Sequence, residues 1–474
     1  MARQLFCIDF GSSYTKVGYR AGVNSQTQLI PHADNTESDE AFCFPSAVLV
    51  DDRGASRRYL FGSEVGRQKL PAGMVPKRNW KPDLFTTAEA APIVLEEGLD
   101  ALLASDDFSS LVRRYRVAQA EVDALMALYR AAGMFARRST LGRPAGSPRG
   151  EPAPDLVTMA VAYFRDLRQK VIETAEHLPG AEDPARIPTR LCVPAFGNDG
   201  QIPQATCELF QSILSRAGWV VDEECPLIAE PVANVIGVIS EGENVTWRPR
   251  PYEEHVNLGR MFHHGPLIKA YRAGREQFAI LVCDIGSYTT DFAVIQFRTN
   301  EDPDLRPVIL QTSIPLGIAA LDDRVASALP PHKTRWLQNA AGRRRELCKR
   351  AMYVDRQAYA TIEVGDIGDS TEREAIDDCL GGFGTEITRA FQEFCVKHSI
   401  TACDEVVLTG GGNHIPTLRH ALLAAMAMRF GTGYLVRVPP GTRTRSAKAV
   451  LTPEQVRGGS ALGGCSVYFD RSYH

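Results

Sequence analysis

The chain has 474 residues, of which 44% are hydrophobic and 23% charged, a composition typical of globular proteins and unlike that of disordered chains. This length allows two or three domains. The 53 basic and 57 acidic residues give a net charge of −4, which argues against a protein that binds nucleic acid or an anionic membrane through its overall charge.

The N-terminal segment and the cysteines favour a cytoplasmic protein. Asp9 stands where a signal peptide needs an apolar core, and no apolar run reaches the roughly 20 residues that span a bilayer. The 11 cysteines are scattered, and no Cys-x-x-Cys pair occurs. We therefore expect reduced, buried thiols rather than disulfides or a zinc site, and no membrane segment.

Two segments of the chain share one pattern. Residues 7–19 read CIDFGSSYTKVGY, and residues 283–294 read CDIGSYTTDFAV. Each pattern predicts an apolar strand that ends near an Asp, a turn rich in glycine and hydroxyl groups, and a second strand. Because such a hairpin occurs in each half, the sequence predicts two related lobes.

Strands and helices alternate along the rest of the chain. We predict helices over 156–172, 202–217, 341–354 and 384–398 and from Pro416 onward, and strands at 191–195, 219–221, 360–364 and 405–409. This alternation indicates an α/β fold. Residues 83–150, mostly helical and arginine-rich, and residues 241–277, loop-like, are predicted insertions. Each is either a solvated surface or a docking surface for an unidentified protein partner or client.

The two hairpins suit a nucleotide triphosphate. Turn glycines Gly11 and Gly286 let backbone N–H groups approach phosphate oxygens, and the neighbouring hydroxyls add donors. Asp9 and Asp284 are candidates to hold Mg²⁺ through its water shell. The alternative is that Asp, Gly and Ser are here only as turn formers.

A second glycine-rich loop follows the predicted strand 405–409. Gly410, Gly411 and Gly412 have no side chains, so a flat base or a phosphate can lie against their backbone. A simple turn from strand to helix is the alternative.

Together these segments resemble the nucleotide-binding domain of the DnaK-type seventy-kilodalton heat-shock chaperones, in the actin/hexokinase/heat-shock ATPase superfamily. The matching segments are 9–14, 193–199, 229–233, 284–291, 345–350, 407–416 and 458–463. The resemblance implies a two-lobed actin-like ATPase of duplicated ribonuclease H-like lobes around a central nucleotide cleft. Lobe I would comprise 1–240 and 454–474, and lobe II 241–453.

The resemblance also implies the roles of individual residues. Lys77 would position the attacking water and offset the charge of the γ-phosphate. Glu230, Asp284 and Asp291 would order the Mg²⁺ waters and the nucleophile, with Asp9 and Asp284 holding Mg²⁺ through water. The implied contacts to ATP or ADP are Gly11, Ser12, Ser13, Tyr14, Gly286, Ser287, Tyr288, Thr289, Gly317, Glu346, Lys349, Arg350, Gly410, Gly411, Gly412 and His414.

Each of these residues also has an alternative interpretation in which its role is only structural. Lys77 and Arg78 can be a solvated basic pair, Glu230 can simply begin a helix, and Glu346 with Arg350 can be an i,i+4 ion pair.

Several residues depart from the family pattern. Ser287, Tyr288 and Ile318 replace glycines, and His414 replaces an arginine expected to stack on adenine. These changes bear on the rate of hydrolysis. After the segment 458–463 the chain ends at His474, so we expect neither an interdomain linker nor a peptide-binding domain.

The leading interpretation is a DnaK-like ATPase that binds Mg-ATP, hydrolyses it slowly and passes the closure of its lobes to a protein partner. Three alternatives stay open: an actin-like protein whose nucleotide state controls filament formation, a kinase of a sugar or another metabolite, and a nucleotide-binding pseudoenzyme. The same clamp serves all four, since a fold does not choose a function.

Overall fold

The structure, a computed structural model, is a mixed α/β protein with three sheets among the residues that it describes. Apart from a few single positions, these are residues 4–22, 27–32, 41–51, 58–62, 74–89, 156–195, 202–240, 269–298, 308–330, 342–354, 370–440 and 447–466. Most of the two predicted insertions and the strand predicted at 360–364 lie outside the described residues.

The first sheet has the strand order β10-β8-β1-β2-β3. Its strands are β1 (Leu5–Phe10), β2 (Tyr14–Arg20), β3 (Gln28–Leu29), β8 (Pro188–Val193) and β10 (Leu227–Ala229), with β4 (Phe44–Pro45) beside β2 and β9 (Val220–Val221) beside β8. β1 and β2 form an antiparallel hairpin, and β1, β8 and β10 run parallel to one another.

The second sheet has the order β13-β12-β11-β14-β15-β16. Its strands are β11 (Gln277–Ile285), β12 (Thr290–Arg298), β13 (Val308–Ile314), β14 (Glu405–Thr409), β15 (Leu435–Val438) and β16 (Ala447–Val450). Again an antiparallel hairpin, β11 with β12, pairs through its first strand with a later parallel strand, β14. The two sheets therefore repeat one arrangement, which agrees with the repetition of the hairpin sequence.

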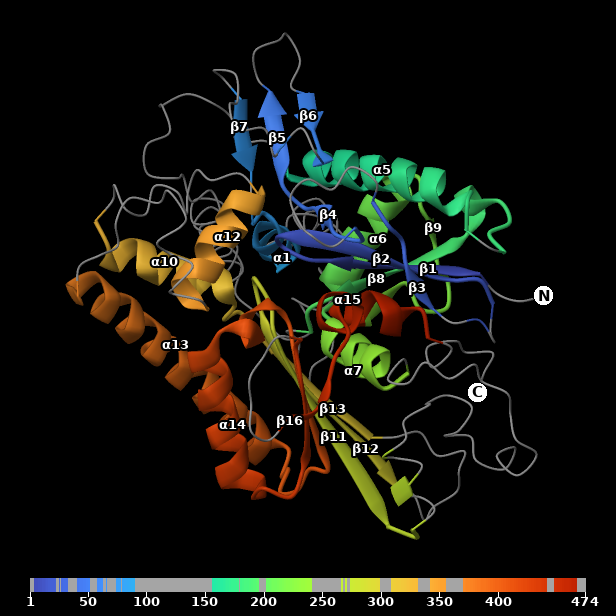
Figure 1. The fold of residues 1–474 in the computed structure, drawn as a ribbon. Helices are drawn as coiled ribbons and strands as arrows, with labels where there is room; N and C mark the ends of the chain where they lie inside the picture. Colours follow the sequence, from blue (N-terminus) through green and yellow to red (C-terminus); the bar gives the residue numbers. More distant parts are fainter. Residues whose placement is uncertain are drawn as a thin grey trace, which may run out of the picture.

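A third sheet, of the order β6-β5-β7, stands above the first sheet (Figure 1). Its strands are β5 (Val48–Asp51), β6 (Arg58–Leu60) and β7 (Met74–Lys77), all antiparallel. β7 leads directly to the short helix α1 (Lys81–Glu89). Val48, at the start of β5, pairs with Lys77 at the end of β7, so β7 ends beside the segment that follows Ser46.

Helices cover the outer faces of the two large sheets (Figure 1). α5 (Leu156–Ala175) and α6 (Gln204–Arg216) pack on the first sheet, through a core that includes Phe6, Ile8 and Phe10 of β1. The second sheet is covered by α10 (Ile318–Ala328), α12 (Gly342–Tyr353), α13 (Ser370–Lys397) and α14 (Pro416–Phe430). Apolar residues thus alternate between the two faces of each central strand, as expected for a layered α/β protein.

Two further helices lie between the large sheets, α7 (Glu230–Ser240) and α15 (Pro453–Gly464) (Figure 1). Their backbones touch, because a Cβ on Gly237 would come within 2.0 Å of the carbonyl oxygen of Gly459. A Cβ on Gly463 would come within 1.7 Å of the carbonyl oxygen of Ala233. Only glycine allows this approach, so these positions fix how closely the two helices pack.

Most predicted elements are present, and the clearest difference concerns α13. The sequence predicts a helix over 384–398, whereas α13 begins at Ser370. The first half of α13 is not predicted because Gly381, Gly382 and Gly384 lie in or beside it, and glycine is a poor helix former. The helix nevertheless continues through them. Apolar residues recur at helical spacing and are all buried in the hydrophobic core between the second sheet and its helices, which we call the second core: Ile376, Leu380, Phe383 and Ile387.

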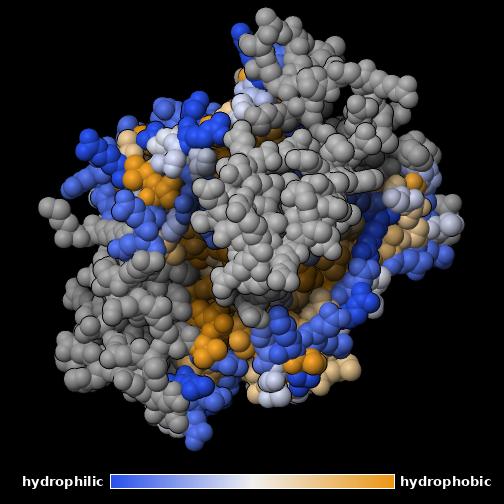
Figure 2. Space-filling view, turned by 180° about the vertical axis from the view of Figure 1, so that it is seen from behind, coloured by the Kyte–Doolittle hydropathy of each residue, from blue (hydrophilic) through white to orange (hydrophobic). Residues whose placement is uncertain are grey.

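All 11 cysteines are free, and Cys7 and Cys192 lie side by side in the core with their sulfurs 3.5 Å apart. Within the described part of the chain, no helix is both long and apolar enough to cross a bilayer. Figure 2 shows hydrophilic side chains over much of the outer edge of the described surface, with apolar ones nearer the middle of that face.

Candidate functional site

The turn of the first hairpin, Asp9 to Ser13, is held in place by Ser46. The Ser46 hydroxyl donates to the Gly11 carbonyl oxygen at 2.6 Å, and the Ser46 N–H donates to the Ser13 carbonyl oxygen at 3.0 Å. Gly11 is required here, because a Cβ would lie 2.3 Å from the carbonyl oxygen of Tyr14. The turn is therefore rigid and kept free of side-chain bulk at Gly11.

The turn of the second hairpin is held by the start of α10. The Gly286 and Ser287 carbonyl oxygens accept from the N–H groups of Ile318 and Ala319 at 3.0 and 2.8 Å. A Cβ on Gly317 would come within 2.4 Å of the Ser287 carbonyl oxygen, so glycine lets α10 approach this closely. Ile318, where the resemblance leads us to expect glycine, is accommodated with its side chain buried in the hydrophobic core of the second sheet.

The two turns meet. The hydroxyl of Ser13 donates to that of Ser287 at 3.3 Å. Tyr288 of the second turn packs against the hydrophobic core of the first sheet. Its ring stacks beside Phe85 of α1, with the centroids 6.3 Å apart. The two hairpins that the sequence singled out thus face each other, although they belong to different sheets.

Four carboxyl groups gather at this meeting point: those of Asp9, Glu230, Asp284 and Asp291. Burial raises the pKa of Asp284 to about 7, aided by the charge of Asp9 and opposed by that of Lys16. Burial, and then the charge of Asp284, raise the pKa of Asp291 to about 7. Burial also raises the pKa of Glu230, against the opposing charge of Lys81. The charge of Asp9 acts on Glu230 and Asp284, and that of Asp284 acts on Asp291, so the four carboxyl groups form one site.

Two lysines and one amide contact these acids. The Lys16 ammonium lies 3.3 Å from a carboxylate oxygen of Asp9, and the Lys81 ammonium lies 2.5 Å from one of Glu230. Burial lowers the pKa of Lys16, but the charge and hydrogen bond of Asp9, together with the charges of Cys43 and Asp284, outweigh burial, so the pKa of Lys16 is raised. The Asn234 side chain donates to Asp284. Lys16, Lys81 and Asn234 are not predicted as site residues from the sequence, although Asn234 follows Glu230 by one helical turn.

The site also contains buried polar atoms without hydrogen-bond partners among the described residues: the Ser12 hydroxyl, one oxygen of Asp291 and the side-chain oxygen of Asn234. Asp291 uses its other oxygen to accept from Thr289 at 3.1 Å. Leaving such a group unpaired costs about 1–3 kcal/mol, so polar atoms of this kind are normally satisfied by a ligand, an ion or water.

The residues fit a hydrated cation better than a directly bound one. Four carboxyl groups face two ammonium groups. Burial first, and then the charges of neighbouring acids, raise the pKa values of Glu230, Asp284 and Asp291. Among the described residues, no group of three or more His, Cys, Asp or Glu side chains is arranged to hold a metal ion directly. Mg²⁺ usually keeps several of its waters, so the acids would contact it through that shell.

The glycine-rich loop lies against the second hairpin. Gly410 has a φ of +81°, and a Cβ there would come within 2.0 Å of an Asp284 carboxylate oxygen. Gly412 packs on Ile285 at a distance that also excludes a side chain, whereas Gly411 faces open space. The structure therefore places the three glycines beside Asp284, with Gly411 accessible.

Of the residues expected near adenosine, His414 ends this loop and is half-buried. Burial, and then the charges of Arg457, Arg350 and Arg419, lower its pKa to about 4, so the imidazole is neutral at pH 7. Its neighbourhood therefore includes Arg350 of α12. Lys349 instead pairs with Asp322 of α10, and the side chain of Glu346 lies outside the described part.

Lys77 forms its ion pair with Asp83 and not with one of the four acids of the site. Its ammonium is 2.9 Å from Asp83, and the two side chains are 39% and 40% exposed. The lysine that contacts a site acid from this segment is Lys81. The signal that could have singled out Lys81 is its position between Trp80 and Pro82, just before the apolar pair Leu84 and Phe85.

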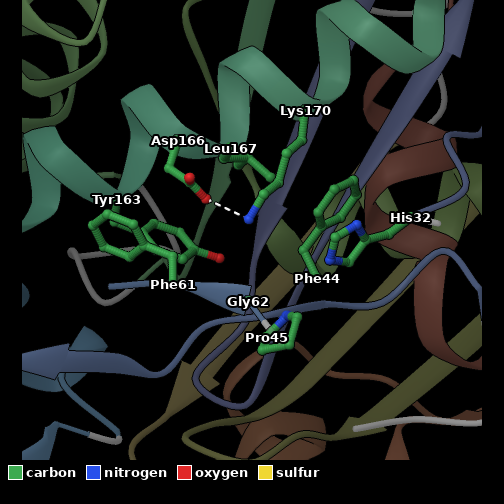
Figure 3. A pocket seen from close by; sticks show the side chains of 9 residues that line it. All are labelled: His32, Phe44, Pro45, Phe61, Gly62, Tyr163, Asp166, Leu167 and Lys170. Atoms are coloured by element: carbon green, nitrogen blue, oxygen red, sulfur yellow. Dashed lines mark hydrogen bonds and ion pairs between the residues drawn. The ribbon is translucent and has the colours of Figure 1, made fainter. Parts of the chain in front are cut away.

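A small pocket lies behind the first turn and is distinct from the acids (Figure 3). It is lined by His32, Phe44, Pro45, Phe61, Gly62, Tyr163, Asp166, Leu167 and Lys170. Lys170 pairs with Asp166 at 2.7 Å along α5, and the His32 ring stacks on Phe44. The Tyr163 hydroxyl donates to Thr15, which bonds Ser46, so the pocket wall supports the first turn.

No protein-family model matches the chain, and no curated protein matches it in sequence.

Proposed function

We propose that the protein is a Mg-ATP-binding ATPase of the two-lobed actin-like kind, resembling the nucleotide-binding domain of the DnaK-type chaperones. The observation that carries this proposal is the meeting of two similar hairpin turns, Ser13 against Ser287, over a group of buried acids. Phosphoryl transfer to water needs positioning and charge stabilisation more than covalent chemistry, and this arrangement offers both.

The turn groups and the acids have separate roles in this proposal. The backbone N–H groups and hydroxyls of Ser12, Ser13, Ser287 and Thr289 would bind phosphate oxygens. Asp9 and Asp284 would hold the hydrated Mg²⁺, which supplies charge neutralisation to the phosphates when bound. Glu230 and Asp291 remain to accept a proton from the attacking water. Gly411 and His414 would lie against adenosine.

The output would be a change in how the two sheets are disposed, passed to an unidentified protein partner. Closure around a ligand at the junction of two similar units is a common way to couple hydrolysis to movement.

A shift of the melting temperature tests binding. We expect excess ATP with Mg²⁺ to raise the melting temperature of the full chain, since a ligand that binds only the folded state stabilises it by about 2.7 kcal/mol at 100 times its Kd. The same ATP with EDTA should raise it much less. An unchanged melting temperature with Mg-ATP would contradict the proposal.

A second candidate is a nucleotide-binding protein without turnover. Two observations favour it: Tyr288 fills part of the second turn and packs on Phe85, and Lys77 is engaged by Asp83. Single-turnover hydrolysis by the wild type separates the two candidates. A rate no faster than that of Mg-ATP without protein, with intact ATP binding, would favour the second.

A further inference from the structure

One turn of α7 carries two polar side chains that contact different parts of the molecule. Glu230 begins α7 and pairs with Lys81 of α1 at 2.5 Å, whereas Asn234 donates to Asp284 at the end of β11. Residues four apart lie on the same face of a helix. This turn of α7 therefore joins α1, on the side of the first sheet, to the second hairpin.

Lys81 is held firmly in this position. Its side chain is only 4% exposed, and its ammonium lies 5.7 Å from the centroid of the Phe10 ring and 6.0 Å from that of Phe85. An ammonium group taken out of water needs its carboxylate partner, because an unpaired buried charge is strongly destabilising. The geometry thus keeps Lys81 and Glu230 together.

The backbone beside Lys81 is tied to the first turn. The indole N–H of Trp80 donates to the carbonyl oxygen of Ser46 at 2.6 Å, and Ser46 in turn binds the Gly11 and Ser13 carbonyl oxygens. The position of the Lys81 ammonium is therefore set by the same residue that holds the turn. Lys77, by contrast, has an exposed ion pair, a kind that contributes little and exchanges readily.

Asn234 is confined in a similar way. A Cβ on Gly459 of α15 would lie 2.7 Å from its side-chain oxygen, so the amide fits between α15 and the second hairpin. An amide at this position donates a hydrogen bond to Asp284 without adding charge. An aspartate there would instead repel Asp284.

We propose that Lys81 and Asn234 are positioning residues for ATP hydrolysis: Lys81 holds the carboxylate of Glu230, Asn234 holds that of Asp284, and α7 fixes the spacing of the two acids. This inference rests on the proposed function. Neither residue needs to touch the nucleotide, since each acts through an acid. Lys81 rather than Lys77 is then the lysine that orders the acids.

Steady-state ATP hydrolysis by the full chain tests this. We expect Lys81→Met and Asn234→Ala each to lower kcat by about 10²-fold, the size of effect that a misplacement of about 1 Å produces, while KM changes by no more than about threefold. Lys81→Arg should restore most of kcat, because it keeps a cation beside Glu230. Asn234→Asp, which keeps the size but adds like charge, should be as inactive as Asn234→Ala.

A matched control comes from another buried ion pair, Arg437 with Glu405, at the opposite end of β14 from Gly410. Arg437→Met should lower the melting temperature about as much as Lys81→Met and leave kcat per folded molecule unchanged. This separates positioning from general loss of stability.

The outcomes are distinct. A wild type that neither binds nor hydrolyses ATP would overturn the proposed function and this inference with it. A wild type that hydrolyses ATP, with folded Lys81→Met or Asn234→Ala as fast, would overturn this inference alone. Equal loss of kcat in Lys81→Arg and Lys81→Met would also count against it.

Discussion

The hydroxyl of Ser13 lies 3.3 Å from that of Ser287, although 274 positions separate the two residues in the chain. This contact joins the turns of two hairpins that belong to different sheets. Under the proposed function a nucleotide would lie between the turns, so we expect it to change the distance between these two serines.

Paired cysteines make that distance measurable. We expect Ser13→Cys combined with Ser287→Cys to form a disulfide under mild oxidation, since side-chain atoms 3.3 Å apart are within reach of a bond of about 2.05 Å after a small adjustment. Mg-ATP should slow its formation, as followed by gel mobility without reductant. The single variants control for the native thiols. Cross-linking at the same rate with and without Mg-ATP would argue against a nucleotide between the turns.

Gly410 should be the most sensitive glycine of the candidate site. We expect Gly410→Ala to destabilise the fold by about 2–5 kcal/mol, because it combines strain at positive φ with overpacking against Asp284. Gly433→Ala is the matched control, since nothing lies within 4 Å of a Cβ there. Urea unfolding of the two variants gives the comparison, and equal stabilities would show that the loop backbone is misplaced.

The free energy of unfolding should fall as pH rises from about 4 to about 7. Asp284 and Asp291 bind a proton more tightly in the folded state, where their pKa values are about 7, than in the unfolded state, where they are near 3.8. Their contribution to stability is therefore complete below the unfolded pKa and is lost as pH approaches the folded one, at up to about 1.4 kcal/mol per pH unit for each group.

Variants identify the groups responsible for this slope. Asp291→Asn should flatten the dependence of unfolding free energy on pH between 4 and 7. A wild type that becomes more stable over this pH range would show that these acids are ionised in the folded state.

The buried pair of Arg190 and Asp222 tests the first sheet independently of the site. Both side chains are fully buried, their closest atoms are 2.6 Å apart, and Arg190 also donates to the carbonyl oxygens of Gly464 and Ser466. Arg190→Met should cost about 3–5 kcal/mol, because it leaves the Asp222 carboxylate buried without its partner. Thermal unfolding measures the loss, and nucleotide binding by the folded fraction should be unaffected.

The hairpins and the glycine-rich loop could be predicted from the sequence because short-range rules govern them. Gly11, Gly286 and Gly410 mark places where backbone approaches closely, and strand patterns on either side give their context. The contact between Ser13 and Ser287, by contrast, depends on how two sheets pack, which no local pattern contains.

The same limit explains the residues that the sequence analysis missed. Lys81 reads as one more charged residue beside Lys77, and only the packing of Phe10, Phe85 and Glu230 around it shows that it is buried. In the sequence Asn234 is likewise indistinguishable from other polar helical residues. Only the packing of α7 against β11 shows that its side chain contacts Asp284. Burial of a polar side chain is a tertiary property, and it distinguishes these two residues from their exposed neighbours.

The contact of α7 with α15 has a consequence for movement. Where two helices meet backbone to backbone through glycines, they can neither separate nor slide by a turn without breaking that fit, but they can still pivot. If the two sheets rearrange, we expect rotation at this contact, close to Asn234 and Gly459, to disturb the packing least. A small swing there would be magnified at the distant edges of the molecule, far from where the acids sit.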